Sequence, residues 1–243
     1  MKRKITILTI AFLSSMLMYA NAFAAATGRC GDSITWTLDD SGNLTLSGSG
    51  EMWNYGYVTS PFKDYGIKTV TIEYGITSIG DYVFRGCCGM TELTLPNGVM
   101  SIGGNAFEGC SGLTELTLPN SVTSIADDAF HGCRGLTELT LPNSVTSIGD
   151  GAFRGCRGLT KLTLPNSVTS IGESAFYLCS GLSKITSLAE IPPVCGSGVF
   201  DGVNKTNCKL IVPIVSVIAY KQAEVWNEFS NIRGFSGVEV TVA

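Results

Sequence analysis

The one histidine of this 243-residue sequence, His131, is the only imidazole available for a catalytic triad, a proton shuttle or a metal site. The residues at multiples of 23 positions from it are Arg85, Glu108, Arg154 and Tyr177. A position that varies between copies of one repeat is typical of a solvent-facing site, so we interpret His131 as an exposed surface residue. The sequence contains no G-x-S-x-G, phosphate-loop, dinucleotide-binding or H-E-x-x-H motif. We therefore expect no enzymatic activity and no cofactor.

Nine cysteines form the second group that could do chemistry. Five recur at the same fixed spacing, namely Cys87, Cys110, Cys133, Cys156 and Cys179. In stacked repeats their Cβ atoms would lie parallel, whereas a disulfide needs them to face each other, so we expect buried free thiols. Cys195 and Cys208 flank a loop outside this series and are the one pair for which a disulfide stays an open alternative. Cys30 and Cys88 are unassigned, and no C-x-x-C pair indicates zinc.

The charged residues exclude further classes. Sixteen basic and twenty acidic residues give a net charge of −4, which argues against binding nucleic acid. An acidic row, consisting of Asp81, Asp127, Asp150 and Glu173, would suggest calcium, but Gly104 interrupts it. Each unit offers one carboxylate where a calcium site needs six or more oxygens, so we expect no metal.

These spacings belong to a repeat of five 23-residue units over residues 68–182. Within one unit, Leu116-Thr117-Leu118 alternates as a strand does, with Thr117 facing outward. Pro119-Asn120 then predicts a turn, and residues 122–125 a second short extended segment. A single unit cannot bury its apolar side chains, whereas stacked units can bury them against their own copies.

The unit Leu113–Gly135, read as L-T-E-L-T-L-P-N-S-V-T-S-I-x-x-x-A-F-x-G-C-x-G, resembles the BspA-like leucine-rich repeat, also called leucine-rich repeat family 5. The resemblance implies a right-handed, β-rich leucine-rich repeat solenoid with an N-terminal β-hairpin cap and a C-terminal strand-helix cap. It also implies an exported or surface-exposed bacterial protein that binds proteins, with adhesion to host matrix or to cells as the usual role.

The flanking segments predict the two caps. Residues 30–52 read as two alternating strands around an Asp39–Asn43 turn, which would close the first turn of the solenoid. A sixth, degenerate unit has a one-residue insertion, because Phe200 follows Phe176 at a spacing one longer than the repeat. Residues 210–213 then form a last strand. We expect Ser216 to cap a helix that runs through Phe229, with one face formed by Ala219, Ala223 and Trp226.

The N-terminus indicates export. Residues 1–24 combine a basic start, an apolar segment and an A-x-A site that ends at Ala24, the pattern of a cleaved signal peptide. We expect a secreted or cell-surface monomer without a transmembrane segment. The predicted organisation is signal peptide 1–24, N-terminal β cap 25–67, five repeats 68–182, and degenerate sixth repeat with C-terminal cap 183–243.

Candidate binding residues form outward rows on the predicted main sheet. The threonine row consists of Thr71, Thr94, Thr117, Thr140, Thr163 and Thr186, and the charged row beside it includes Glu92, Glu115, Glu138 and Lys161. A second candidate is an arginine cluster near the Phe-x-Gly-Cys bends, formed by Arg134, Arg154 and Arg157. One interpretation of the rows is a ligand-binding face, and the resemblance implies that the ligand is a host-matrix or cell-surface protein. The alternatives are β propensity and solubility alone, a glycan ligand, or a passive spacer without a ligand.

Overall fold

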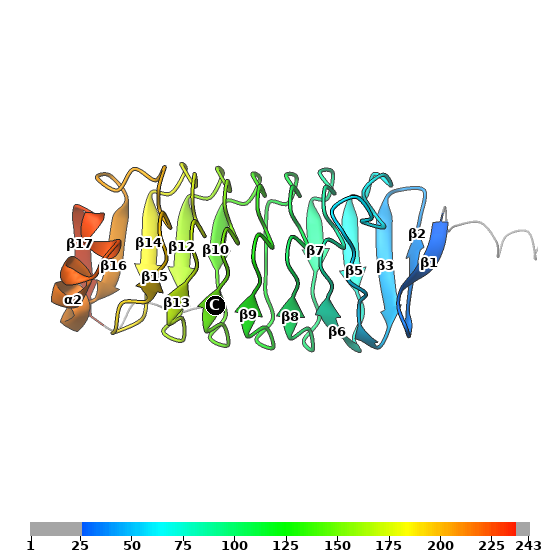
Figure 1. Ribbon diagram of the computed structural model, residues 1–243, viewed down its shortest axis with the longest axis horizontal. Helices are drawn as coiled ribbons and strands as arrows, with labels where there is room; N and C mark the ends of the chain where they lie inside the picture. The colour runs from blue at the N-terminus through cyan, green and yellow to red at the C-terminus, as the bar shows by residue number, and fades with distance from the viewer. Residues whose placement is uncertain (1–25, 237–243) are drawn as a thin grey trace, which may run out of the picture.

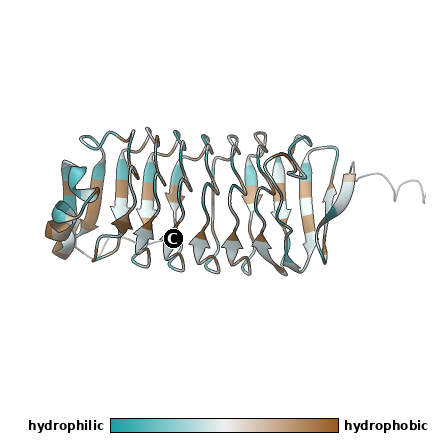
Figure 2. Ribbon diagram, viewed as in Figure 1, coloured by the Kyte–Doolittle hydropathy of each residue, from teal (hydrophilic) through white to brown (hydrophobic). Residues whose placement is uncertain are grey.

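The computed structural model describes residues 26–236 as an elongated β-solenoid whose turns lie side by side from one end to the other (Figure 1). Most units contribute one longer strand and one short strand, and these line different faces of the solenoid. Hydrophobic and polar bands recur at the same level in neighbouring strands (Figure 2). This repetition is the stacking of identical side chains that the repeat period predicts, and the expected solenoid is therefore confirmed.

The longer strands form two five-stranded sheets. The first has the order β1-β2-β3-β5-β7, with β1 (Ala26–Gly31), β2 (Ile34–Leu38), β3 (Asn43–Gly48), β5 (Thr69–Ile72) and β7 (Glu92–Thr94). The second has the order β10-β12-β14-β16-β17, with β10 (Glu138–Thr140), β12 (Lys161–Leu164), β14 (Lys184–Ser187), β16 (Lys209–Pro213) and β17 (Asn231–Phe235). Neighbouring repeat strands pair in parallel and in the register of the repeat, so that Thr140 pairs with Thr163.

The short strands form one continuous seven-stranded sheet. It consists of β4 (Gly50–Glu51), β6 (Ile76–Ile79), β8 (Ser101–Ile102), β9 (Ser124–Ile125), β11 (Ser147–Ile148), β13 (Ser170–Ile171) and β15 (Val194–Cys195). Ser170 pairs with Val194, which places the expected one-residue insertion between β13 and β15. Because this sheet is unbroken, it holds the whole array of repeats in register.

A column of stacked phenylalanine rings fills the centre. Seven rings follow one another with centroids 5.1 to 5.6 Å apart, namely Phe62, Phe84, Phe107, Phe130, Phe153, Phe176 and Phe200. All seven are fully buried. Trp36 meets the first ring edge-on at 5.4 Å, and Trp226 and Phe229 cover the last. Phe62 lies before the first repeat of the sequence analysis, so the column begins within the N-terminal cap.

The N-terminal cap has the predicted hairpin. Strands β2 and β3 pair antiparallel, and Asp39 Oδ1 accepts hydrogen bonds from the backbone N–H groups of Ser41 and Asn43 to hold the turn. Strand β3 pairs in parallel with β5, so the hairpin does continue into the repeats. Strand β1 adds a third antiparallel strand that the sequence did not indicate.

The C-terminal cap differs from the expectation. Helix α2 (Val217–Gln222) is one short helix between the 3-10 turns η1 (Ile214–Ser216) and η2 (Trp226–Glu228), and Ser216 makes no side-chain cap. Tyr220 and Trp226 are both fully buried against the last rings. In one continuous helix, residues six apart lie about 240° around the axis, so both could not face the core. The chain therefore leaves the helix at Ala223, and Ala219 is exposed.

The strand predicted as the last one is not the last. Strand β17 follows the cap helix and pairs in parallel with β16 along its whole length. The edge of β16 is thus covered by the chain itself. Among residues 26–236, no helix has the length and apolar character needed to cross a bilayer.

One position in each unit takes the left-handed backbone conformation. The residues there are Tyr82, Asn105, Asp128, Gly151, Ser174 and Gly198, with φ between 51° and 62°. Only glycine adopts this conformation without a steric cost from its Cβ atom. The repeat thus carries a strained position wherever a unit has a side chain there.

Candidate functional site

The threonine and glutamate rows lie on the face formed by the longer strands. Strand pairing places Glu138 beside Lys161, and Thr140 beside Thr163. Glu92, Glu115 and Glu138 are exposed, as are Thr94, Thr117 and Thr140, while Thr163 is half-buried. Thr186 is buried, so the exposed threonine row ends before β14.

The charge along the glutamate row changes sign at an ion pair. Lys161 Nζ contacts Glu138 Oε1 across neighbouring strands, and more than half of each side chain is exposed. An exposed pair of this kind contributes little, about 0 to 1 kcal/mol, to the free energy of unfolding. The basic side continues through Lys184 and Lys209, which follow Lys161 in register. The row is therefore acidic towards the N-terminus and basic towards the C-terminus, as the sequence predicted.

The face of longer strands is interrupted in its middle, at residues 114–118. These residues form no strand, although β7 before them and β10 after them do. Within the described chain, Glu115, Leu116, Thr117 and Leu118 make no backbone-to-backbone hydrogen bond, and only the carbonyl of Thr114 accepts one, from Thr137 at 3.4 Å. We call these five residues the interrupted rung.

Surface depressions lie on both sides of the interrupted rung. One of about 830 Å³ lies between it and β10 and is lined by residues that include Glu115, Thr117, Glu138 and Thr140. A second, of about 360 Å³, lies between it and β7. The side chains of the rung are also less well covered, because Leu116 and Leu118 are 7% and 6% exposed while Leu139 and Leu141 are 1% and 2% exposed. The candidate residues thus line these two depressions, which together we call the opening.

Sequence reasoning missed this opening because no residue signals it. Leu116-Thr117-Leu118 and Leu139-Thr140-Leu141 are identical tripeptides in units that differ at only three positions. Residues 116–118 form no strand, whereas Leu139 and Thr140 belong to β10. The structure gives no local reason for the difference.

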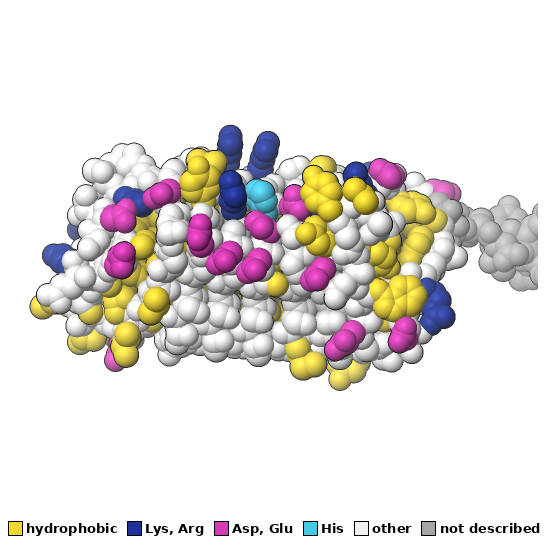
Figure 3. Space-filling model, in the orientation of Figure 1, with side chains coloured by type: hydrophobic (Ala, Val, Ile, Leu, Met, Phe, Trp, Pro, Cys, Tyr) yellow, Lys and Arg dark blue, Asp and Glu magenta, His cyan; other side chains and the backbone are white. Residues whose placement is uncertain are grey.

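The predicted arginine cluster lies away from these strands, at the bends that follow each phenylalanine. Arg134, Arg154 and Arg157 are all exposed, and the Arg154 guanidinium lies 5.1 Å from the centre of the Tyr177 ring. Figure 3 shows basic side chains gathered at one edge of the molecule beside the single histidine, with acidic side chains in a row next to them.

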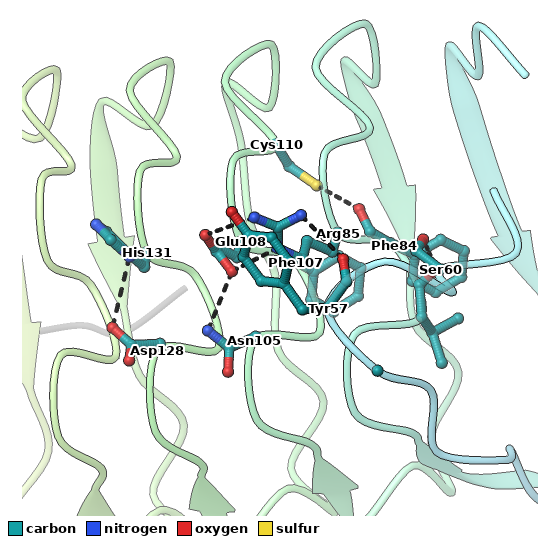
Figure 4. Close-up of polar contacts among 12 residues, drawn as sticks. Tyr57, Ser60, Phe84, Arg85, Asn105, Phe107, Glu108, Cys110, Asp128 and His131 are labelled. Atoms are coloured by element: carbon teal, nitrogen blue, oxygen red, sulfur yellow. Dashed lines mark hydrogen bonds and ion pairs between the residues drawn. The ribbon is translucent and has the colours of Figure 1, made fainter. Parts of the chain in front are cut away.

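The row that contains His131 holds two ion pairs (Figure 4). Arg85 makes a bidentate contact with Glu108, with Nε 2.8 Å from Oε2, and its guanidinium stacks on Tyr57 at 3.5 Å. His131 Nδ1 lies 3.5 Å from Asp128 Oδ1. Burial raises the pKa of the Asp128 carboxyl, and the neighbouring His131 and Arg154 oppose that shift. His131 is only partly exposed, less than the sequence suggested.

Three aspartates of the acidic row considered for calcium make contacts with the next unit. Asp81, Asp127 and Asp150 each accept a hydrogen bond on Oδ1 from a backbone N–H of the next unit, at 2.7 to 2.8 Å. Each carboxylate thus links one turn of the solenoid to the next. Within residues 26–236, no group of three or more His, Cys, Asp or Glu side chains lies close enough to hold a metal ion.

The repeat cysteines lie inside the core as free thiols. The Sγ atoms of Cys110, Cys133, Cys156 and Cys179 contact the carbonyl oxygen of the phenylalanine in the preceding unit, at 3.2 to 3.3 Å. Burial raises the pKa of Cys133 well above its ordinary value. Their expected inward position is confirmed.

Cys195 and Cys208 are also free thiols, so the structure lacks the disulfide considered between them. Cys195 is part of β15 and its Sγ contacts the carbonyl of Pro193, whereas Cys208 is buried in the core beside β16. The strands β15 and β16 belong to different sheets. The predicted signal peptide and its cleavage site at Ala24 lie outside the described residues.

The comparisons with known proteins agree with this architecture. A family model described as the BspA type leucine rich repeat region matches in six copies, over residues 59–183 and 105–211. No curated protein matches the sequence.

Solved structures of bacterial leucine-rich repeat proteins are similar to this chain. A leucine-rich repeat protein from Eubacterium ventriosum is 32% identical, with a TM-score of 0.60, over 67% of this chain and 44% of that one. A leucine rich cell surface protein from Faecalibacterium prausnitzii is 27% identical, with a TM-score of 0.56, over 78% of this chain and 55% of that one. The leucine-rich repeat protein of T. pallidum, 24% identical with a TM-score of 0.53 over 72% of this chain and 89% of that one, shares the fold.

The present chain spans about half the length of the first two of these proteins. The repeat register, the stacked phenylalanines and the matched repeats all lead to the same assignment. The chain belongs to the BspA-type leucine-rich repeat family.

Proposed function

We propose that this protein is an exported, non-enzymatic scaffold that binds another protein through the face around the interrupted rung. The observation that carries the proposal is the position of the 830 Å³ depression, which is lined by Glu115, Thr117, Glu138 and Thr140. Backbone groups that make no backbone-to-backbone hydrogen bond and exposed carboxylates meet there.

The sign of the charge specifies the partner further. Glu92, Glu115 and Glu138 make the region around the interrupted rung acidic, so the partner surface that fits it is basic. The cell-surface description of the Faecalibacterium prausnitzii relative supports a role outside the cell, in adhesion or host interaction. The A-x-A site at Ala24 supports the same location.

The partner can be identified by crosslinking on intact cells. A photoreactive amino acid at Thr117, on the interrupted rung, is expected to capture the partner, and the same amino acid at the exposed Thr146 on another face serves as the control. Equal capture from both positions, or none from Thr117, contradicts the proposed face.

Charge reversal then tests the face quantitatively. Glu115→Lys with Glu138→Lys is expected to slow association with the captured partner and to reverse its salt dependence, because surface charges steer encounter. The control, Glu190→Lys with Glu224→Lys, makes the same change in net charge at exposed positions elsewhere. Surface plasmon resonance at two salt concentrations measures both. An association rate that is the same for both variants places the binding site elsewhere.

Export is tested separately. Protein purified from the native bacterium is expected to begin at Ala25 and to occur outside the cytoplasm. Mass spectrometry that finds residues 1–24 still attached contradicts the signal peptide.

A further inference from the structure

A group of three arginines on the edge away from the sheet face makes no ion pair within the described chain. Arg134 and Arg157 occupy the same position in consecutive units, where the flanking units have Ser111 and Ser180. Arg154 lies in the adjacent row, and its carbonyl accepts a hydrogen bond from Gly132 at 2.8 Å, two residues before Arg134. The phenylalanine rings of these two units are 5.3 Å apart, which sets the spacing of the turns. The three arginines therefore lie on two adjacent turns, in two neighbouring rows.

The repeat supplies its own comparison in Arg85. Arg85 occupies the same row as Arg154, three units earlier, and forms a bidentate pair with Glu108 of the next unit while only 12% of its side chain is exposed. Arg154 is followed in the next unit by Tyr177 instead of a carboxylate. Within the described chain, Arg134, Arg154 and Arg157 make no ion pair. Arg85 is thus held in an ion pair within the protein, whereas the three arginines of the cluster are available to contact a ligand.

The fold gains nothing evident from this arrangement. Like charges on adjacent turns repel, and all three side chains are exposed, so none gains burial that would offset the repulsion. The chain carries a net charge of −4, so a positive cluster on it is a local exception. The carboxylate that faces the cluster is Asp128, which lies beside His131.

The chemistry of the cluster indicates its ligand. A guanidinium group is planar, remains charged, and binds oxyanions in a bidentate way. The Tyr177 ring lies under Arg154 and is half-buried, and the part of the ring that Arg154 does not cover adds an apolar surface for a sugar ring. We propose that Arg134, Arg154 and Arg157, together with Tyr177, form a binding site for a sulfated polysaccharide. This site is separate from the sheet face and does not depend on the protein-binding role.

The test measures binding of dextran sulfate to the protein, with unsulfated dextran and polyphosphate as comparison ligands. The triple variant Arg134→Ser, Arg154→Tyr and Arg157→Ser installs residues that neighbouring units already hold at these positions. Its Kd for dextran sulfate at low salt is expected to rise at least about tenfold, and unsulfated dextran is expected not to bind. A control variant removes three exposed lysines elsewhere, by Lys63→Ser, Lys209→Ser and Lys221→Ser.

The outcomes separate the alternatives. A triple arginine variant that binds as the unaltered protein does, or a lysine control that loses as much affinity, overturns the site. Tyr177→Ser is expected to weaken binding of dextran sulfate and to leave binding of polyphosphate unchanged. Polyphosphate that binds as tightly as dextran sulfate, with no effect of Tyr177→Ser on either, shows a general anion surface and overturns the assignment to a sulfated glycan. A thermal unfolding curve for each variant confirms that it is folded.

Discussion

At the scale of single residues, the core of each turn is a phenylalanine ring and a thiol that contacts the backbone of the preceding turn. The thiols are fully buried, whereas Cys88, adjacent to Cys87 in the sequence, is exposed. A thiolate is the reactive form of cysteine, and burial disfavours that charged form. The same residue type therefore has opposite expected reactivity at two positions in one unit.

Alkylation at pH 8 without denaturant is expected to label Cys88 and to leave Cys110, Cys133 and Cys156 unmodified. The physical reason is exclusion from solvent combined with the raised pKa of the buried thiols. Peptide mass spectrometry reads the label at each site, and guanidinium chloride provides the fully labelled control. Rapid labelling of the three repeat cysteines in the folded protein contradicts the packing described here.

The left-handed position predicts opposite effects for two exchanges. Ser174→Gly is expected to stabilise the protein by about 0.5–1 kcal/mol, and Gly151→Ala to destabilise it by about 1–2 kcal/mol. Both residues lie at the same place in consecutive units, so each serves as the control for the other. Denaturant unfolding measures the free energies, and changes of the same sign contradict the argument.

At the scale of elements, neighbouring turns of the solenoid are linked by aspartate side chains that accept hydrogen bonds from backbone N–H groups of the next turn. Asp127 accepts from the N–H of Asp150, and Asp150 accepts from the N–H of Glu173. The sequence showed the row, and its spacing excluded calcium, but the hydrogen bonds could not be predicted. They depend on the angle between turns, which no residue type encodes.

The aspartate contacts are expected to be worth about 0.5–1.5 kcal/mol each, the usual net value of a hydrogen bond. Asp150→Ala should lower the free energy of unfolding by this amount, whereas Asp150→Asn keeps an acceptor oxygen and should cost less. Chemical denaturation measures the free energy of unfolding of both variants. An alanine variant as stable as the asparagine variant means that water replaces the carboxylate without loss.

The C-terminal cap is the element for which sequence reasoning was least accurate. The apolar residues at 219, 223 and 226 fit one helical face, but Tyr220 and Trp226 both had to reach the end of the phenylalanine column. Burial of two large rings against one surface overrode helical periodicity. The parallel pairing of β17 with β16 was equally hidden, because Asn231–Phe235 has no alternation of polar and apolar residues.

Removal of the ring that closes the column should be costly. Trp226→Ala is expected to lower the free energy of unfolding by about 3–5 kcal/mol, the range for a buried aromatic side chain. Ile218→Ala, at an exposed position of helix α2, is expected to change it by less than about 0.5 kcal/mol. Comparable losses for the two variants, measured by denaturation, would show that the cap is not closed by Trp226.

At the scale of the whole molecule, the protein behaves as a one-dimensional stack in which each unit contacts its neighbours. The period, the core residues and the fold class could all be read from the sequence, because stacking makes identical positions equivalent. The interrupted rung could not, since its tripeptide is identical to that of β10. The register of the rows was predicted correctly, although Thr186 is buried rather than exposed, while the depressions beside the interrupted rung are a property of the assembled stack.

A whole unit should be removable. Deletion of residues 137–159 joins Leu136 to Thr160 in the same register as the original junction, so we expect a folded, shorter solenoid with one cooperative unfolding transition and a moderately lower Tm. Deletion of residues 137–158 falls one residue short of a full unit and shifts the alternation of the strand by one, which turns apolar side chains outward. Circular dichroism and light scattering are expected to show a folded monomer for the first variant and aggregation for the second.

The interrupted rung also determines how the solenoid responds to mechanical load. Elsewhere, neighbouring turns are held together by the central rings and by backbone hydrogen bonds on the longer-strand face, in the short-strand sheet and at the bends. At residues 114–118 the bonds of the longer-strand face are largely missing, while the short strands, the bends and the rings still resist separation. Bending stiffness is therefore lowest at this point, and the two five-stranded sheets act as stiff arms on either side of it. Under a stretching force the turns separate first there, which increases the separation between the strands beside Glu115 before either arm unravels. A ligand that bridges β7 and β10 would make the joint rigid.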